Sequence, residues 1–108
     1  ISGGMQKRAA IARAIALDPE IVFLDEPSAG LDPITSSSLD HLIKDLAKNL
    51  NISFVVVTHE LASIEAIADR AIMLHDGKVV ARGSISDLKT KTDNPYVQQF
   101  FNREATHG

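Results

Sequence analysis

The chain has 108 residues, of which 44% are hydrophobic and 23% are charged, with a formal net charge of -3 and no cysteine. This composition is that of an ordinary globular protein, and the weak net charge gives no reason to expect nucleic-acid binding. Without cysteine, the chain has no disulfide framework and no thiolate to act as a nucleophile or metal ligand.

The ends and the hydropathy of the chain bear on its setting. It opens Ile1-Ser2-Gly3-Gly4 without an initiator methionine, inside what looks like a functional loop, so we expect it to be a piece of something longer. No apolar run approaches the roughly 20 residues that cross a bilayer, and no signal peptide opens the chain. Contact with a membrane is therefore expected to pass through a partner protein.

The first half of the chain alternates helix and strand patterns. Residues 5–17 have helical periodicity, which Asp18-Pro19 ends, and residues 21–24 form a short apolar run typical of a buried parallel strand. Asp32-Pro33 predicts an N-cap with proline at the first helical position. The helix that follows has one apolar face, made of Leu39, Leu42, Ile43, Leu46 and Leu50.

The second half begins with another buried-strand candidate, residues 52–57, which Thr58-His59 follows. Residues 60–68 predict a short helix, and residues 71–74 and 78–81 flank Asp76-Gly77, a strong hairpin turn signal. Ser84 is expected to cap a helical turn through Leu88. Asn94-Pro95 is expected to start a last helix with Val97, Phe100 and Phe101 as its apolar stripe, and the tail from Asn102 is expected to fray.

This alternation predicts an α/β fold with a mainly parallel sheet, closed by an antiparallel hairpin. In such sheets, ligands bind beyond the carboxyl ends of the strands. Asp25, Glu26 and His59 all follow predicted strand ends. We therefore expect the chemistry of the protein at this edge.

Asp25 and Glu26 are adjacent carboxylates at the end of an apolar strand, where desolvation is costly without a cation or hydrogen bonds. In a nucleotide hydrolase, the first can hold Mg²⁺, directly or through water, and the second can orient and deprotonate the attacking water. The alternative is a solvated acidic turn. His59 could likewise donate to a γ-phosphate oxygen or be a structural histidine.

Two further segments allow a functional and a structural interpretation. Ser2, Gly3 and Gly4 precede a helix, whose dipole and exposed backbone N–H groups would suit an anion; the alternative is an ordinary flexible N-cap. Residues 28–32, Ser-Ala-Gly-Leu-Asp, could be a functional loop or a plain loop in which Asp32 caps the helix.

The order of these segments resembles the ATPases of ABC transporters, over residues 1 to about 83. Residues 2–5 look like the signature motif, with Met5 where glutamine is usual. Residues 21–26 resemble Walker B, residues 28–32 the D-loop, and Thr58-His59 the switch histidine. The resemblance implies the C-terminal portion of one ABC ATPase domain of the P-loop NTPase (RecA-like) type, over residues 1–108, with no second domain.

The resemblance also implies roles for individual residues. Asp25 would lie in the Mg²⁺ sphere, Glu26 would be the general base, and His59 would contact the γ-phosphate of ATP. Residues 2–5 would bind the ATP of an opposite subunit, and Asp32 would join the interface of this homodimer. Hydrolysis would then drive an integral membrane permease.

A narrower resemblance is to the Mla/Mce-associated ATPases of bacterial lipid transport. It depends on residues 3–8, on Asp-Pro-Ile-Thr at 32–35, and on Asn-Pro-Tyr-Val-Gln-Gln-Phe at 94–100. It implies transport of phospholipid or another hydrophobic compound, a lipid-binding Mce-type partner, and a peripheral location on the cytoplasmic face of the bacterial inner membrane. The alternatives are an ABC ATPase for another solute, a soluble non-transport ABC protein, and a non-catalytic regulatory or binding module.

One essential part of such an ATPase is missing from the sequence. No G-x-x-x-x-G-K-[ST] motif is present, so the lysine and the backbone cradle for the β- and γ-phosphates are absent. The resemblance places the P-loop strand between the strands at 52–57 and 71–74, so we expect a gap in the sheet with unpaired edges. We expect the 108 residues alone to be inactive and to associate through those edges.

Overall fold

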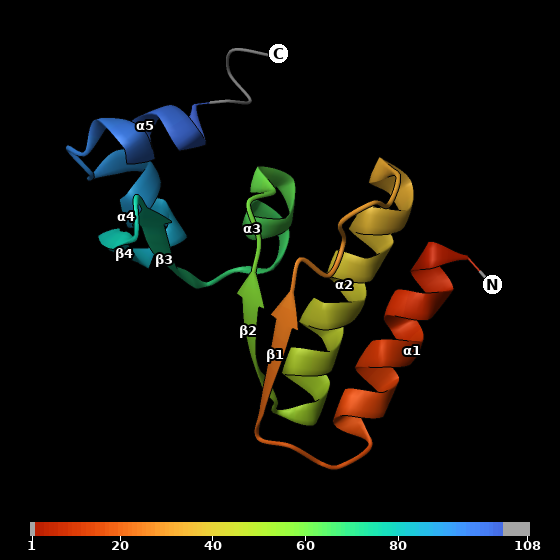
Figure 1. Ribbon diagram of the computed structural model, residues 1–108. Helices are drawn as coiled ribbons and strands as arrows, with labels where there is room; N and C mark the ends of the chain where they lie inside the picture. Colours follow the sequence, from red (N-terminus) through yellow and green to blue (C-terminus); the bar gives the residue numbers. More distant parts are fainter. Residues whose placement is uncertain (1, 103–108) are drawn as a thin grey trace. The chain divides into compact units, whose positions relative to one another are not determined.

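The computed structural model describes residues 2–102. These residues divide into two compact units, one that ends at Ile67 and one that begins at Ala68. The predicted tail beyond Asn102 and the first residue, Ile1, lie outside the described residues. The first unit contains α1 (Gly3–Ile15), β1 (Ile21–Asp25), α2 (Pro33–Leu50), β2 (Ser53–Val57) and α3 (Leu61–Ile67). The second contains β3 (Arg70–His75), β4 (Lys78–Ser84), α4 (Ile85–Thr90) and α5 (Pro95–Phe101), and Figure 1 shows all of these elements.

The first unit is built on a parallel pair of strands, as the sequence predicts. β1 and β2 run in register from Ile21 opposite Ser53 to Asp25 opposite Val57. Both strands therefore end at the same edge, and Figure 1 shows their arrowheads side by side. The α/β fold with a parallel sheet and an antiparallel hairpin is thereby confirmed.

The core of this unit lies on one face of the strand pair. Ile11 of α1 and Leu39 and Ile43 of α2 are its buried centre. Leu24 of β1 and Phe54 of β2 pack against it from the sheet, together with Leu31, Leu42, Leu46 and Ile67. The apolar face predicted for α2 is thus confirmed as far as Leu46, whereas Leu50 is exposed.

The prediction that both strands are buried holds for one face only. Side chains alternate along a strand, so Ile21 and Phe23 point away from the face that carries Val22 and Leu24. Phe23 is 74% exposed, and Val55 and Val57 on the same face of β2 are also exposed. Within the described part of the unit, the helices cover one side of the sheet and leave the other bare.

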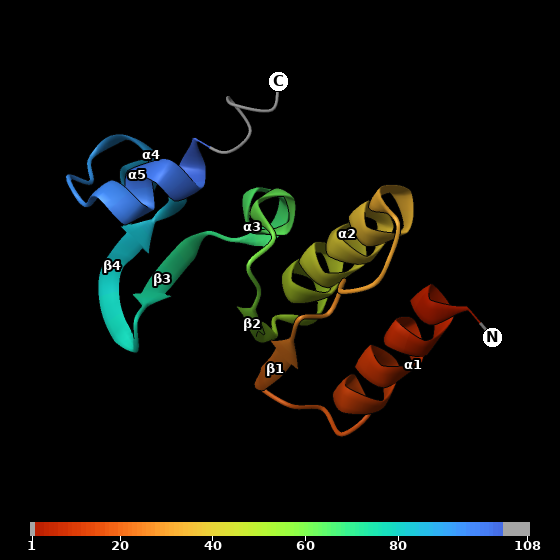
Figure 2. The same cartoon turned by 45° about the horizontal axis from the view of Figure 1, so that its top comes forward.

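The second unit is a hairpin followed by two short helices. Asp76 and Gly77 both adopt positive φ, 52° and 73°, which is the conformation of the tight turn that this residue pair predicts. Ser84 caps α4 and Asn94 caps α5, both as expected. Leu88, Val97 and Phe101 are buried. Figure 2 shows the hairpin with α4 and α5 from a second direction.

The two strand pairs form separate sheets, since β1 pairs with β2 and β3 with β4, and no ladder among the described residues joins β2 to β3. No helix within residues 2–102 combines the length and apolar character needed to cross a membrane.

Candidate functional site

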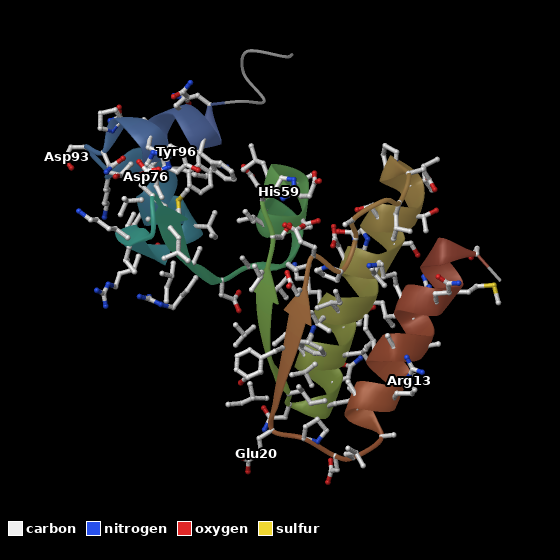
Figure 3. The ribbon with its side chains drawn as sticks, viewed as in Figure 1. Arg13, Glu20, His59, Asp76, Asp93 and Tyr96 are labelled. Carbon is white, nitrogen blue, oxygen red and sulfur yellow. The ribbon has the colours of Figure 1, made fainter. Side chains whose placement is uncertain are left out.

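Glu26 and His59 meet at the carboxyl edge of the parallel strands. His59 Nδ1 lies 2.7 Å from Glu26 Oε1. A carboxylate oxygen accepts, so the ring N–H at Nδ1 donates in this hydrogen bond. Figure 3 shows His59 close to the end of β2. The sequence placed these two side chains at one edge, and the structure brings them into direct contact.

The backbone holds Glu26 in place for this contact. Its N–H donates to the carbonyl of Val57 over 2.7 Å, which continues the β1–β2 ladder by one residue. Its carbonyl then accepts from the N–H of Ala29 over 3.2 Å and closes a turn. Glu26 has a φ of 47°, in the left-handed region that non-glycine residues rarely adopt. Such a conformation costs about 1–3 kcal/mol and is typical of functional sites.

The second carboxylate oxygen of Glu26 is available for chemistry. Oε2 is buried and has no hydrogen-bond partner among the described residues, although the side chain as a whole is 31% exposed. A buried carboxylate oxygen without a partner is costly, so a water molecule or a cation would suit this position. The opposite side of His59 faces Glu60, whose carboxylate lies 3.7 Å from Nε2.

Asp25 is the last residue of β1 and is exposed. No cluster of three or more metal-binding side chains occurs within residues 2–102. Mg²⁺ in nucleotide-hydrolysing sites is held by one or two carboxylates together with water and the phosphates of the substrate. The exposed carboxylate of Asp25 is of the chemical kind that such an ion takes, with water and phosphate oxygens as its other ligands.

Ser2, Gly3, Gly4 and Met5 lie at the start of α1, and Figures 1 and 2 both draw α2 between this helix and α3. Ser2 caps α1 by accepting from the N–H of Met5 over 3.1 Å, and Met5 is 56% exposed. The N-cap predicted as one of two interpretations is therefore present.

The glycines at this helix start have a packing role. A Cβ added at Gly4 would lie 2.7 Å from Cγ2 of Thr35, and one at Gly3 would lie 3.3 Å from Cδ2 of Leu31. Gly4 thus lets α1 approach the first turn of α2. Close packing accounts for Gly4 without any ligand.

Asp32 caps α2, as the sequence predicts. Its Oδ2 accepts from the N–H groups of Ile34 and Thr35, both over 3.1 Å, and its Oδ1 accepts from the Thr35 hydroxyl over 2.6 Å. These hydrogen bonds, first that from the Thr35 hydroxyl, hold the pKa of Asp32 below its ordinary value of 3.8. The capping role is observed, and it leaves the carboxylate exposed at the surface.

A buried polar chain next to the site was not found by sequence reasoning. Ser28 Oγ lies 3.2 Å from Ser63 Oγ, and the Ser63 hydroxyl donates to Asp40 Oδ2 over 2.9 Å. Burial raises the pKa of Asp40, while the hydrogen bond from Ser63 lowers it in part. One signal was available. Asp40 lies three residues before Ile43 and Ser63 four before Ile67, so both fall on apolar helix faces.

Comparisons with known proteins agree with this fold. Residues 1–29 match the model of the ABC transporter family. The chain is 48% identical over 100 residues to the intermembrane phospholipid transport system ATP-binding protein MlaF of Escherichia coli K12, covering 93% of this chain and 37% of that protein. It is 37% identical over 100 residues to the methionine import ATP-binding protein MetN of Haemophilus ducreyi, covering 93% of this chain and 29% of that protein.

Two solved structures of ABC proteins have a fold similar to that of this chain. An inward-facing ABC transporter of the metal-chelate type superposes with a TM-score of 0.77 at 32% identity, over 83% of this chain and 36% of the other. A dimeric ATP-binding cassette in a post-hydrolysis state, bound to ADP and Pi, superposes with a TM-score of 0.67 at 38% identity, over 78% of this chain and 36% of the other.

The fold is that of part of an α/β ATP-binding cassette, and over 93% of its length the chain is similar to ATP-binding proteins of ABC transporters. Its sequence identity is higher to the phospholipid transport protein, at 48%, than to the methionine import protein, at 37%. The chain spans about 37% of the length of that relative.

Proposed function

We propose that this chain supplies the hydrolysis half of an ATP site, in the ATPase subunit of a bacterial ABC transporter. The observation that carries the proposal is the 2.7 Å contact between Glu26 Oε1 and His59 Nδ1 at the carboxyl ends of two parallel strands. Ligands of open α/β sheets bind at that edge. The similarity to a cassette bound to ADP and Pi supports the same assignment.

Glu26 is the proposed general base. One of its oxygens is held by His59 and the other is buried without a partner, so the second can accept the proton of a water molecule. The oxygen of that water attacks the γ-phosphorus, the bond to the bridging oxygen breaks, and ADP leaves with the electron pair. The proton from the water remains on Glu26.

His59 and Asp25 have supporting roles in this proposal. With Nδ1 donating to Glu26, Nε2 is the ring nitrogen of His59 that would donate to the γ-phosphate, which requires a protonated ring. Asp25 would hold Mg²⁺, which would supply positive charge to the phosphates. The phosphate cradle belongs to a P-loop that these 108 residues do not contain, and we assign it to another part of the protein.

The start of α1 is proposed to act on the ATP of a second, identical subunit. Ser2, Gly3, Gly4 and Met5 would present the N-terminal end of a 13-residue helix to the γ-phosphate, and Asp32 would lie at the interface. The dimeric form of the structural neighbour supports this arrangement. Both compact units are assigned to one ATPase domain, which binds an integral membrane permease.

Phospholipid, or another hydrophobic compound, is the proposed cargo. The identity of 48% to the phospholipid transport protein, against 37% to the methionine importer, favours it. A lipid-binding Mce-type partner and a peripheral position on the cytoplasmic face of the inner membrane belong to the same proposal. A cassette for another solute is the second candidate, because the methionine importer also matches over 93% of the chain.

The test uses the full-length protein with its P-loop. Glu26→Gln keeps the shape of the side chain and removes its basicity, so ATP binding should persist while turnover falls by about 10²–10⁴-fold. Normal turnover of Glu26→Gln would remove Glu26 from the role. For the cargo, ATPase activity of the protein with its permease in detergent should respond to added phospholipid and not to added methionine; the reverse response would assign another solute.

A further inference from the structure

The described residues bury three polar side chains, and all three belong to one hydrogen-bonded chain. Ser28, Ser63 and Asp40 are 7%, 3% and 3% exposed. They come from the loop after β1, from α3 and from α2. Because each hydroxyl or carboxylate is removed from water, each depends on its neighbour for a hydrogen bond.

The direction of the chain follows from counting protons. Ser63 has one hydroxyl proton, which it donates to Asp40 Oδ2. It therefore can only accept from Ser28, so the Ser28 hydroxyl donates to Ser63. The chain runs from Ser28 through Ser63 to the carboxylate of Asp40. Removing the Ser63 hydroxyl would leave both of its neighbours without a partner.

These hydrogen bonds join the two segments that carry the candidate catalytic groups. Ser28 follows Glu26 by two residues, inside the turn that the Glu26 carbonyl closes with Ala29. Ser63 follows His59 by four residues, in the helix that begins at Leu61. Asp40 ties both segments to α2, next to the core residue Leu39.

We infer that Ser28, Ser63 and Asp40 form a positioning clamp that keeps Glu26 and His59 at hydrogen-bonding distance, with Ser63 as its central residue. The inference rests on the proposed function, because it assigns the clamp to the same hydrolysis site. None of the three side chains is required to touch the nucleotide. Loss of the clamp should therefore lower the rate of the chemical step and leave substrate binding in place.

The experiment measures kcat and KM for ATP in the full-length protein. Ser63→Ala removes the central hydroxyl, and Ser28→Ala removes one end of the clamp while keeping the Ser63–Asp40 bond. Ser28→Thr is the conservative variant, since it keeps a hydroxyl. Ser37→Ala is the matched control, because it makes the same change at an exposed position of α2.

Displacements of about 1 Å in a site can cost on the order of 10²-fold in rate. We expect Ser63→Ala to lower kcat by at least about tenfold with KM within about twofold of wild type. Ser28→Ala should lower kcat in the same direction, whereas Ser28→Thr and Ser37→Ala should stay within about twofold of wild type.

If the three side chains act in stability alone, Ser63→Ala and Ser28→Ala should lower the Tm, while their kcat stays equal to that of the control variant Ser37→Ala. That result would overturn the clamp. If Ser63→Ala does not fold, the comparison of kcat between Ser28→Ala and Ser28→Thr tests the clamp instead. If Glu26→Gln arrests turnover while both alanine variants keep a normal kcat, only the clamp is refuted. If Glu26→Gln turns over normally, the proposed function itself is refuted.

Discussion

The N–H of Glu26 donates to the carbonyl of Val57 over 2.7 Å, one residue beyond the paired ends of β1 and β2. This bond fixes the backbone of the acidic residue against the strand that leads to His59. Two residues that are 33 positions apart in sequence can then share a side-chain hydrogen bond. The parallel register therefore determines the geometry of the candidate site.

Gly4→Ala should destabilise the full-length protein. The new Cβ would lie 2.7 Å from Cγ2 of Thr35, so α1 and α2 have to separate, and overpacking of this kind costs about 1–3 kcal/mol. Urea unfolding measures the effect. Gly3→Ala is the control, because its Cβ would meet only the end of the flexible Leu31 side chain at 3.3 Å. Equal stability of the two variants would contradict the close approach.

Asp32 should contribute stability that disappears in acid. Its folded pKa is lowered from 3.8 by hydrogen bonds, so the folded state favours the carboxylate. The contribution is complete above pH 3.8 and is lost as the pH falls through the lower, folded pKa. Urea midpoints measured down to pH 2.5 should fall more steeply in wild type than in Asp32→Asn. Parallel curves for the two proteins would exclude this linkage.

Asp40 should have the opposite dependence on pH. Burial raises its pKa above 3.8, so the folded state binds the proton more tightly than the unfolded state does. Its unfavourable contribution is fully present above the folded pKa and is relieved as the pH falls toward 3.8. Asp40→Asn cannot titrate, so its stability relative to wild type should decrease as the pH is lowered through this window. A constant difference would show that the Asp40 pKa is not raised.

The 108 residues by themselves should neither bind ATP tightly nor hydrolyse it. They contain no P-loop, and Ile21, Phe23, Val55 and Val57 leave one face of the strand pair exposed. We therefore expect self-association, which size-exclusion chromatography over a range of concentrations would detect. Calorimetric titration with ATP measures binding. Tight, stoichiometric binding by this stretch would refute the expectation.

Local signals in the sequence predicted most of the secondary structure. Asp32, Ser84 and Asn94 cap helices because a side-chain oxygen satisfies N–H groups that are adjacent in the chain. Asp76-Gly77 predicts its turn for an equally local reason, since both residues tolerate positive φ. The strand ends then indicated where Glu26 and His59 would meet.

Features that depend on contacts between distant segments were not predictable in this way. Periodicity gave no reason to pair Ser63 with Ser28 or Asp40, because each pair is separated by 23 or more residues. The close approach at Gly4 depends on the packing of two helices. Similarly, an apolar run indicates a strand but does not reveal that helices cover only one of its faces, as at Phe23.

The central claim is that Glu26 and His59 act as one unit in ATP hydrolysis, and a double-mutant cycle tests it most directly. Single-turnover rates are measured for full-length wild type, Glu26→Gln, His59→Ala and the double variant. Glu60→Gln is the control, because it makes the same change to the carboxylate on the other side of His59, 3.7 Å from Nε2.

We predict that Glu26→Gln and His59→Ala each slow hydrolysis and that the double variant is within about twofold of Glu26→Gln alone, as expected for groups that act together. Glu60→Gln should hydrolyse ATP at nearly the wild-type rate. A double variant whose loss equals the product of the two single losses would contradict the account, since the two side chains would then act independently despite their 2.7 Å contact.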